Sequence, residues 1–174
     1  MRLLLGISGG IAAYKAPELI RLATAQGHEI RCILTENARH LVAEATLHTL
    51  SGQAVHHSLW PENGSIPHIE TVRWCDGLLI APATANVLAK CALGLADDLL
   101  TTAFLALEPH KPCWLAPAMN TVMWEKPIVQ SHLRSLSAYG CRIIPPVEGN
   151  LACGESGTGA MADPQAILSA MGAG

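Results

Sequence analysis

The stretch that decides the fold runs from residue 3 to residue 34 and reads LLLGISGGIAAYKAPELIRLATAQGHEIRCIL. Residues 3–7 are a short apolar run that predicts a β-strand, which Ser8-Gly9-Gly10 ends. An amphipathic pattern follows and closes at Gly27, as a helix does at a glycine C-cap. Residues 30–34 then predict a second strand. A strand, a helix and a strand within this length form a βαβ unit, which favours a parallel sheet with helical crossovers.

The same alternation continues along the rest of the chain. We expect helices over residues 35–45, 69–74, 83–107 with a break near Gly94, 128–138 and from Pro164 onward, and strands over 77–81, 112–116 and 141–144. The turn-rich segment 51–67 and the glycine-rich segment 149–161 are expected to be loops. The predicted fold class is therefore α/β: a single doubly wound (Rossmann or flavodoxin-like) parallel sheet of about five strands, flanked by helices. Residues 1–174 are expected to form one domain.

The composition narrows the class of partner. Half of the 174 residues (50%) are hydrophobic and only 14% are charged, against about 25% in an average soluble protein. So few charges do not coat a whole monomer, and we expect part of the surface to meet another subunit. The net charge of −3 and the aromatic content of 4% give no basic surface, which argues against a nucleic-acid partner.

Membrane insertion and export are also not expected. The longest charge-free apolar stretch, residues 77–89, contains Pro82 and Asn86 and is shorter than the ~20 residues that a membrane span needs. The N-terminal apolar run is too short for the core of a signal peptide. The cysteines, at positions 32, 75, 91, 113, 141 and 153, form no C-x-x-C pair and no zinc spacing. We therefore expect reduced thiols, no metal site and a cytoplasmic location.

Small and polar residues follow the predicted strands, at the edge where open parallel sheets bind ligands. Ser8-Gly9-Gly10-Ile11 follows the first strand, and its amides and the positive end of the following helix suit a phosphate. A tight turn between strand and helix is the alternative. Thr35, two residues before Asn37, follows the second strand and offers either a further hydroxyl on this edge or a plain N-cap.

Two further segments of this kind follow the third and fourth strands. Residues 81–86 read APATAN, so that small residues let a flat ligand approach the backbone while Thr84 and Asn86 supply hydrogen bonds. Residues 117–124 read PAMNTVMW, in which the amide of Asn120 can hold a carboxylate or a carbonyl. Core packing and helix capping are the alternatives for each segment taken alone. Their meeting on one edge of one sheet favours a binding site.

Two single residues carry reactive side chains. His68 follows Pro67 at the start of a short predicted helix, where it is either a base or a structural N-terminal residue. Cys153 lies in a polar, glycine-rich segment, whereas the other five cysteines lie in apolar surroundings. A thiol in such a segment is reachable, so Cys153 is the best candidate for a chemically active cysteine.

Together these residues resemble the flavin-containing cysteine decarboxylases, and most closely the phosphopantothenoylcysteine decarboxylases of coenzyme A synthesis. The resemblance rests on five elements in the family's order: SGGIAAYK at residues 8–15, HIE at 68–70, PATAN at 82–86, PAMNTVMW at 117–124 and the loop around Cys153. They span residues 6–164, nearly the whole chain. The P-x-M-N-x-x-M-W element is highly specific, whereas the glycine turn is not.

The resemblance implies an FMN-dependent carboxy-lyase that is a homotrimer, or a multiple of trimers, with FMN held between subunits. It places the cofactor against Ser8, Gly9, Gly10, Ile11, Thr35, Asn37, Thr84, Ala85, Asn86, Val87 and Ala118. It makes His68 the catalytic base and Cys153 the acid of a second half-reaction. The substrate would be bound by Asn120, which takes the carboxylate, and by Asn150, Leu151, Ala152 and Met161.

The implied reaction converts 4′-phosphopantothenoylcysteine into 4′-phosphopantetheine. A cysteine carboxylate does not lose CO2 readily, because the resulting carbanion has nowhere to delocalise. Oxidation of the thiol-bearing carbon, with FMN as acceptor, gives a thioaldehyde that serves as an electron sink. After CO2 leaves, the enethiolate is reduced again and a thiol supplies the proton, so that no external reductant is needed.

Two departures from the family keep other substrates and functions open. Ala160 stands where the family usually has arginine, and Val87 stands where many members have threonine. The loss of a guanidinium puts the binding of an anionic substrate in question. One alternative is an oxidative decarboxylase of a peptide's C-terminal cysteine, although those members typically lack the active cysteine loop. Others are a non-catalytic flavin-binding regulatory subunit and a prenyl-transferring flavoprotein.

Overall fold

A parallel sheet forms the centre of the computed structural model, which describes residues 1–61, 64, 66–150 and 156–172. Its strands are β1 (Arg2–Ile7), β2 (Glu29–Leu34), β3 (Val55–His56), β4 (Gly77–Ala83), β5 (Cys113–Pro117) and β6 (Arg142–Ile143). Within the described residues the sheet has six strands in the order β3-β2-β1-β4-β5-β6, and every neighbouring pair is parallel. The doubly wound α/β prediction is confirmed, with one strand more than expected. The extra strand is the two-residue β3, inside the segment predicted to be a loop.

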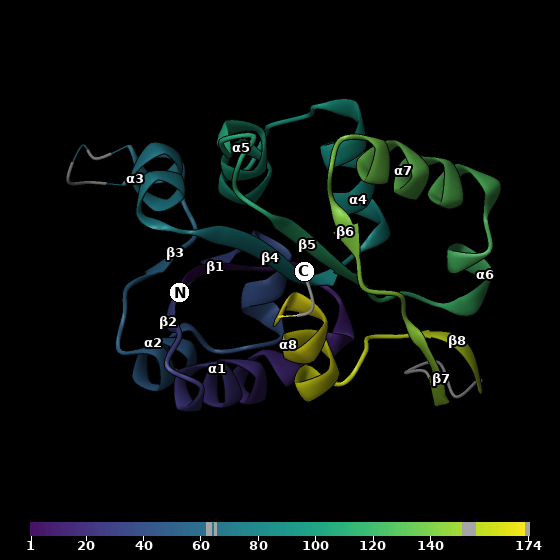
Figure 1. Ribbon diagram of the computed structural model, residues 1–174, viewed down its shortest axis with the longest axis horizontal. Helices are drawn as coiled ribbons and strands as arrows, with labels where there is room; N and C mark the ends of the chain where they lie inside the picture. Colours follow the sequence, from purple (N-terminus) through teal and green to yellow (C-terminus); the bar gives the residue numbers. More distant parts are fainter. Residues whose placement is uncertain (62–63, 65, 151–155, 173–174) are drawn as a thin grey trace.

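Helices cover both faces of this sheet (Figure 1). One face carries α1 (Ala16–Ala25), α2 (Glu44–Ser51) and α8 (Pro164–Gly172), and the other carries α3 (Pro67–Trp74), α4 (Ala85–Leu93), α5 (Leu99–Ala106) and α7 (Pro127–Ala138). Side chains of β1 alternate between the two layers, since Leu3 and Leu5 pack with the first group and Leu4 with the second. Burial on both sides explains why β1 is a continuous apolar run.

Two predicted helices begin or divide differently from expectation. Residues Ile11–Lys15 form a 3₁₀ helix, and α1 continues from it with Pro17 in its first turn. Proline fits there because the first turn of an α-helix needs no N–H from it. The single helix expected over 35–45 is a 3₁₀ helix, Glu36–His40, followed by α2. Between them the buried side chain of Val42 packs into the core.

The prediction of a loop over residues 149–161 was wrong for the part of this segment that the structure describes. This segment contributes to an antiparallel hairpin of β7 (Val147–Asn150) and β8 (Ser156–Ala160). Its glycines serve close packing: a Cβ on Gly157 would collide with Thr121 of the short helix α6 (Thr121–Trp124), and one on Gly159 with the carbonyl of Met119. None of the helices in the described part of the chain is long and apolar enough to span a membrane.

Candidate active site

The predicted site residues gather where the parallel strands end. β1, β2, β4 and β5 all point their carboxyl ends at one edge of the sheet, and a predicted segment follows each of them. β1 lies between β2 and β4, so the crossovers change direction at the β1–β4 junction. Open α/β sheets bind their ligands at this kind of topological switch point.

Ser8 ties the ends of β1 and β4 together. Its side chain is fully buried, its Oγ donates a hydrogen bond to the Pro82 carbonyl at 2.7 Å, and it accepts one from the Thr84 N–H at 3.0 Å. The hydroxyl therefore faces the protein, although Ser8 was expected beside a cofactor. In the structure, Ser8 holds the turns that follow β1 and β4 in place through these two hydrogen bonds.

Gly9 and Gly10 let three loops approach closely at this junction. A Cβ on Gly9 would collide with the side chain and backbone of Asn37. A Cβ on Gly10 would lie 3.1 Å from the Thr84 Cγ2 atom, and the Pro82 ring and the Ala118 carbonyl oxygen lie close by. Position 9 consequently requires glycine for lack of space, whereas a Cβ at position 10 would be in tight contact with Thr84.

A cavity of about 490 Å³, here called the first cavity, opens over this junction. Its lining includes nine of the residues expected at the cofactor: Gly9, Gly10, Thr35, Asn37, Thr84, Ala85, Asn86, Val87 and Ala118. Thr35 and Thr84 are also N-caps, which accept hydrogen bonds from the N–H groups of Ala38 and Val87 at 3.4 Å. The sequence left helix capping and ligand binding as alternatives for these threonines. In the structure each threonine both caps a helix and lines the cavity.

The sequence did not single out the charged side of the first cavity. Lys90 Nζ lies 2.7 Å from Asp97 Oδ1 and 3.1 Å from Asp98 Oδ2, and the hydrogen bond from Lys90 holds the pKa of Asp97 below its usual range. Asp98 also caps α5 through a capping box with Thr101, and the D-x-x-T spacing at 98–101 is a signal that could have identified it. Two carboxylates neutralise Lys90. An anionic group of a ligand in this cavity would therefore be bound by backbone amides and hydroxyl groups.

A second cavity, of about 510 Å³, adjoins the first and shares Gly10, Ala118 and Met119 with it. Asn120 and Met161, both expected at the substrate, line it, and so does Ile11, which was expected at the cofactor. Lys15, which the sequence pattern placed inside a helix, also lines it and donates a hydrogen bond from Nζ to the Met161 carbonyl at 3.0 Å. Asn120 Oδ1 accepts a hydrogen bond from the Val122 N–H at 2.8 Å, so the residue also caps α6.

The β7–β8 hairpin supplies one wall of the second cavity. Glu148, Gly149, Gly159 and Ala160 line it, and the Met119 N–H donates to the Gly159 carbonyl at 3.0 Å, which fixes the hairpin to the segment after β5. Asn150 is the last residue of β7. Leu151, Ala152 and Cys153, which were expected at the substrate or in catalysis, lie outside the described residues.

His68 lies apart from both cavities. It occupies the first turn of α3, where Pro67 is compatible with the helix start, and it is half-buried. Its Nδ1 atom is buried, and no hydrogen-bond partner for it occurs among the described residues. His68 is also not among the described residues that line either cavity. Within one chain, the expected base and the expected cofactor residues are therefore not brought together.

A doubly wound sheet with two adjoining cavities at its switch point is the arrangement in which open α/β proteins typically bind their ligands. The sequence profile of the Flavoprotein family matches residues 1–173. The chain belongs to this family.

Named relatives narrow this assignment. The chain is 43% identical to the phosphopantothenoylcysteine decarboxylase of Arabidopsis thaliana, over 97% of this chain and 82% of that one. It is 42% identical to the coenzyme A biosynthesis bifunctional protein CoaBC of Haemophilus influenzae, over 97% of this chain but only 42% of the relative's length. The chain thus spans less than half of that bifunctional protein.

Solved structures agree with these relatives. A mutant of PPC decarboxylase in complex with pantothenoylaminoethenethiol has a TM-score of 0.90 and 40% identity, covering 98% of this chain and 95% of that one. An FMN-dependent cysteine decarboxylase, SpaF, has a TM-score of 0.83 and 35% identity, covering 98% and 97%.

Proposed function

We propose that this chain catalyses the FMN-dependent decarboxylation of the cysteine moiety of 4′-phosphopantothenoylcysteine, giving 4′-phosphopantetheine. The observation that carries the proposal is the wall of Gly10, Ala118 and Met119 that the two cavities share. Because the two cavities share these lining residues, a flat ring in the first cavity and a short thiol-bearing chain in the second would be adjacent. The names of the relatives that match the chain over nearly its full length support the same reaction.

The residues of the first cavity fit FMN. Gly9 and Gly10 leave bare backbone where a Cβ would collide with Asn37 or crowd Thr84, and Thr35 and Thr84 add hydroxyl groups beside the N-termini of two helices. Neutral donors of this kind suit a phosphate and a ribityl chain. FMN bound there would supply a hydride acceptor for oxidation of the thiol-bearing carbon and a hydride donor for the later reduction.

The second cavity would hold the substrate. Asn120 would bind its carboxylate from the cavity wall, with Met161, Asn150, Leu151 and Ala152 contacting the rest of the molecule. Lys15 is the one cation among the described lining residues of this cavity, and Glu148 is the one carboxylate. An ammonium at this place gives an anionic substrate group a partner, which Ala160 does not provide.

Proton transfer would fall to His68 and Cys153, and we propose that a homotrimer completes the site. His68 is not among the described lining residues of either cavity within one chain, and in the proposed trimer a neighbouring copy would bring its imidazole to them. The low charge content, 14%, is compatible with part of the surface lying in an interface. We further propose that residues 1–174 form one domain and that the protein is cytoplasmic, in agreement with five described cysteines that are all free thiols.

The direct test is purification followed by an absorption spectrum and product analysis. We expect bound flavin, release of CO2 from phosphopantothenoylcysteine, and a product with the mass of 4′-phosphopantetheine. Light scattering should give a trimer or a multiple of it. A protein that stays colourless after incubation with FMN would contradict the proposal, as would a flavin-loaded monomer at micromolar concentration.

Replacing Gly10 by valine should weaken flavin binding. A Cβ at this position already lies 3.1 Å from Thr84 Cγ2, and the two methyl groups of valine would fill the junction of the cavities. Overpacking of a tight site typically costs about 1–3 kcal/mol, so FMN affinity should fall between about fivefold and about 150-fold. The measurement is a titration of apoprotein with FMN. Gly172→Val is the matched control, since a Cβ there meets nothing within 4 Å and binding should be unchanged.

Asn120→Asp should lower kcat/KM steeply without affecting the fold. Aspartate can still cap α6 in place of the carbonyl oxygen that accepts from Val122, but its charge would face the substrate carboxylate. Like charges at about 4 Å repel by roughly 1–4 kcal/mol, which predicts a loss between about fivefold and several hundredfold. Steady-state kinetics measures it. Gln26→Glu adds the same charge on an exposed surface and should have parent activity; parent kinetics for Asn120→Asp would exclude the contact.

A second candidate, oxidative decarboxylation of a peptide's C-terminal cysteine, is favoured by Ala160 in the wall of the second cavity. A small side chain there leaves room for a peptide and removes a cationic partner for phosphate. The two candidates are separated by offering phosphopantothenoylcysteine and a cysteine-ended peptide to the same protein. Loss of CO2 from the peptide alone would select the second candidate.

A further inference from the structure

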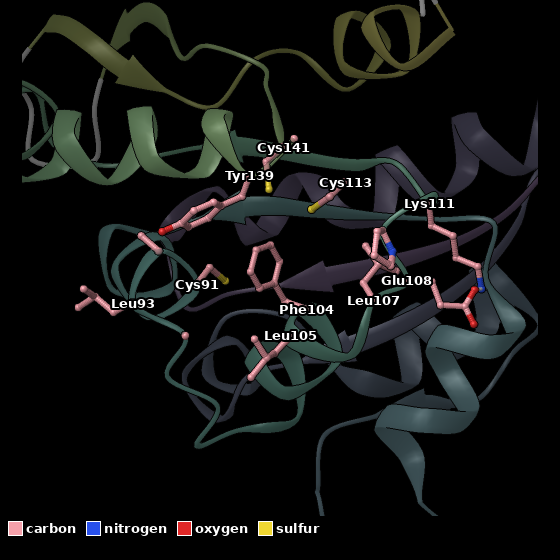
Figure 2. A pocket seen from close by; sticks show the side chains of 14 residues that line it. Cys91, Leu93, Phe104, Leu105, Leu107, Glu108, Lys111, Cys113, Tyr139 and Cys141 are labelled. Atoms are coloured by element: carbon pink, nitrogen blue, oxygen red, sulfur yellow. Dashed lines mark ion pairs between the residues drawn. The ribbon is translucent and has the colours of Figure 1, made fainter.

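A third cavity, of about 450 Å³, lies between the end of α4, α5 and the beginning of β5. It shares no described lining residue with the first or second cavity. Figure 2 shows its lining side chains, which are mostly apolar and include Phe104, Leu107 and Tyr139. Three of the chain's cysteines, Cys91, Cys113 and Cys141, line this one cavity. The proposed decarboxylation uses none of them.

Two of these thiols are paired by the strand register. Trp114 of β5 lies opposite Arg142 of β6, so the same register one residue earlier places Cys113 opposite Cys141. Both side chains belong to the same core cluster and hence to the same face of the sheet. In Figure 2 their sulfur atoms point toward one another above the cavity.

This geometry makes the two sulfurs chemically unequal. The Cys113 S–H stabilises a thiolate on Cys141, which lowers the pKa of Cys141 and raises that of Cys113. Burial raises the pKa of the third thiol, Cys91, to about 12, which keeps it protonated. A thiolate is the reactive form of cysteine, so Cys141 is the nucleophile of the group.

The cavity also gives these thiols access that the other buried cysteines lack. Cys141 and Cys113 are 8% and 6% exposed, whereas Cys32 and Cys75 are 0% and 1% exposed. Cys32 and Cys75 are not among the described residues lining any of the three cavities. A small, uncharged oxidant can therefore reach Cys141 through the cavity without unfolding of the core.

We propose that Cys113 and Cys141 form a peroxide-oxidisable dithiol site, in which Cys141 reacts and Cys113 resolves. The Cys141 thiolate attacks hydrogen peroxide, a sulfur–oxygen bond forms, the oxygen–oxygen bond breaks, and hydroxide leaves. The Cys113 sulfur then attacks the resulting sulfenic acid, so that a disulfide forms and the oxygen leaves as water with the Cys113 proton. In sum, two thiols and one peroxide give one disulfide and two waters. The oxidant is a peroxide, and its two electrons come from the two sulfurs.

The spacing of the strands permits this bond. Neighbouring strands lie ~4.8 Å apart, within the Cα–Cα range of ~4.4–6.8 Å that disulfides span. The bond would fasten the edge strand β6 to β5 and close the loop that contains α6 and α7. Closing such a loop restricts the unfolded chain, so oxidation should raise the melting temperature by several degrees.

The test is peroxide treatment of the full chain with FMN bound, followed by alkylation of the remaining thiols and peptide mapping. We expect a Cys113–Cys141 cross-link that is lighter by two hydrogens, reverses with dithiothreitol and raises the melting temperature. Cys32 and Cys75 should remain alkylatable after denaturation, as internal controls within the same sample. Mapping also separates this bond from any oxidation of Cys153.

Two variants sharpen the test. In Cys113→Ser the sulfenic acid on Cys141 has no resolving partner, so a dimedone adduct should form at Cys141 and the cross-link should be lost. Cys75→Ser, in the same core cluster but with a sulfur that donates to the Val72 carbonyl, should cross-link like the parent. The proposal is overturned if Cys113 and Cys141 both stay reduced in peroxide, if Cys141 gains two oxygens without cross-linking, or if Cys91 replaces either partner. If Cys113→Ser does not fold, the proposal is tested by the peptide map of the parent protein and by the reversal of its cross-link with dithiothreitol.

Discussion

His68→Asn should abolish CO2 release while the flavin stays bound. Asparagine cannot take up a proton near neutral pH, and removal of a general base typically costs a factor of about 10²–10⁴ in rate. The flavin should remain because His68 is absent from the described lining of the first cavity. The two measurements are radiometric CO2 release and the flavin absorbance of the purified variant. Loss of CO2 release with the flavin still bound identifies a base, whereas loss of the flavin identifies a residue that holds the cofactor.

His110→Asn is the matched control. The His110 side chain is 75% exposed and lies 3.5 Å from Glu108, outside the cavities that we assign to cofactor and substrate. It should release CO2 at the parent rate. If His68→Asn does the same, His68 is a structural residue at the start of α3. If His68→Asn loses its flavin, the imidazole belongs to the cofactor site and its assignment as a base fails.

Mixing the His68→Asn and Asn120→Asp variants, whose own activities are subtracted, tests whether His68 serves a neighbouring copy. His68→Asn keeps Asn120, and Asn120→Asp keeps His68, so a site between the two kinds of chain has both residues. In a trimer assembled at random from equal amounts, about a quarter of the sites become complete, and roughly that share of parent activity should return. No recovery would mean that each chain uses its own His68.

The fold was readable from the sequence because burial on both faces leaves a plain signal. The runs at residues 3–7 and 77–81 contain no polar side chain, and the run at 30–34 contains only Arg31, which identifies strands covered on both sides. The edge strand β3 was missed because two residues, Val55 and His56, carry no periodicity. The hairpin was missed for another reason: Gly157 and Gly159 permit close packing against α6 and Met119, and the sequence alone does not separate this use of glycine from loop flexibility.

Much of the candidate site was also predictable, since parallel strands bring the residues after them to one edge. Thr35, Thr84 and Ala118 come from three separate segments and line one cavity. The charged groups were not predictable in this way. Lys15 reaches the second cavity from a helix through its hydrogen bond to the Met161 carbonyl, and Lys90 is held by Asp97 and Asp98 of the next connection. Both placements depend on tertiary contacts, which a pattern along the chain does not encode.

Cys153→Ser should separate the two halves of the proposed reaction. The substitution leaves His68 and Asn120 in place, so the substrate should still be oxidised and lose CO2. A serine hydroxyl is a far poorer acid than a thiol with a pKa of ~8.5, and reprotonation of the enethiolate should therefore stall. Under anaerobic conditions the absorbance of oxidised flavin should bleach, and a product two hydrogens lighter than 4′-phosphopantetheine should accumulate.

The place of Cys153 in the chain gives this prediction its specificity. The residue lies outside the described residues, but the strands on either side of it, β7 and β8, form a wall of the second cavity. Cys75→Ser, which changes a buried thiol in the core, should turn over with no bleaching. If Cys153→Ser turns over normally, Cys153 takes no part; if its flavin stays yellow and no CO2 is released, Cys153 acts in the first half-reaction instead.

The parent protein is itself informative, because Ala160 stands in the same hairpin. A parent that stops at the enethiol would mean that the hairpin does not complete the reduction, and the peptide substrate would then be the better assignment.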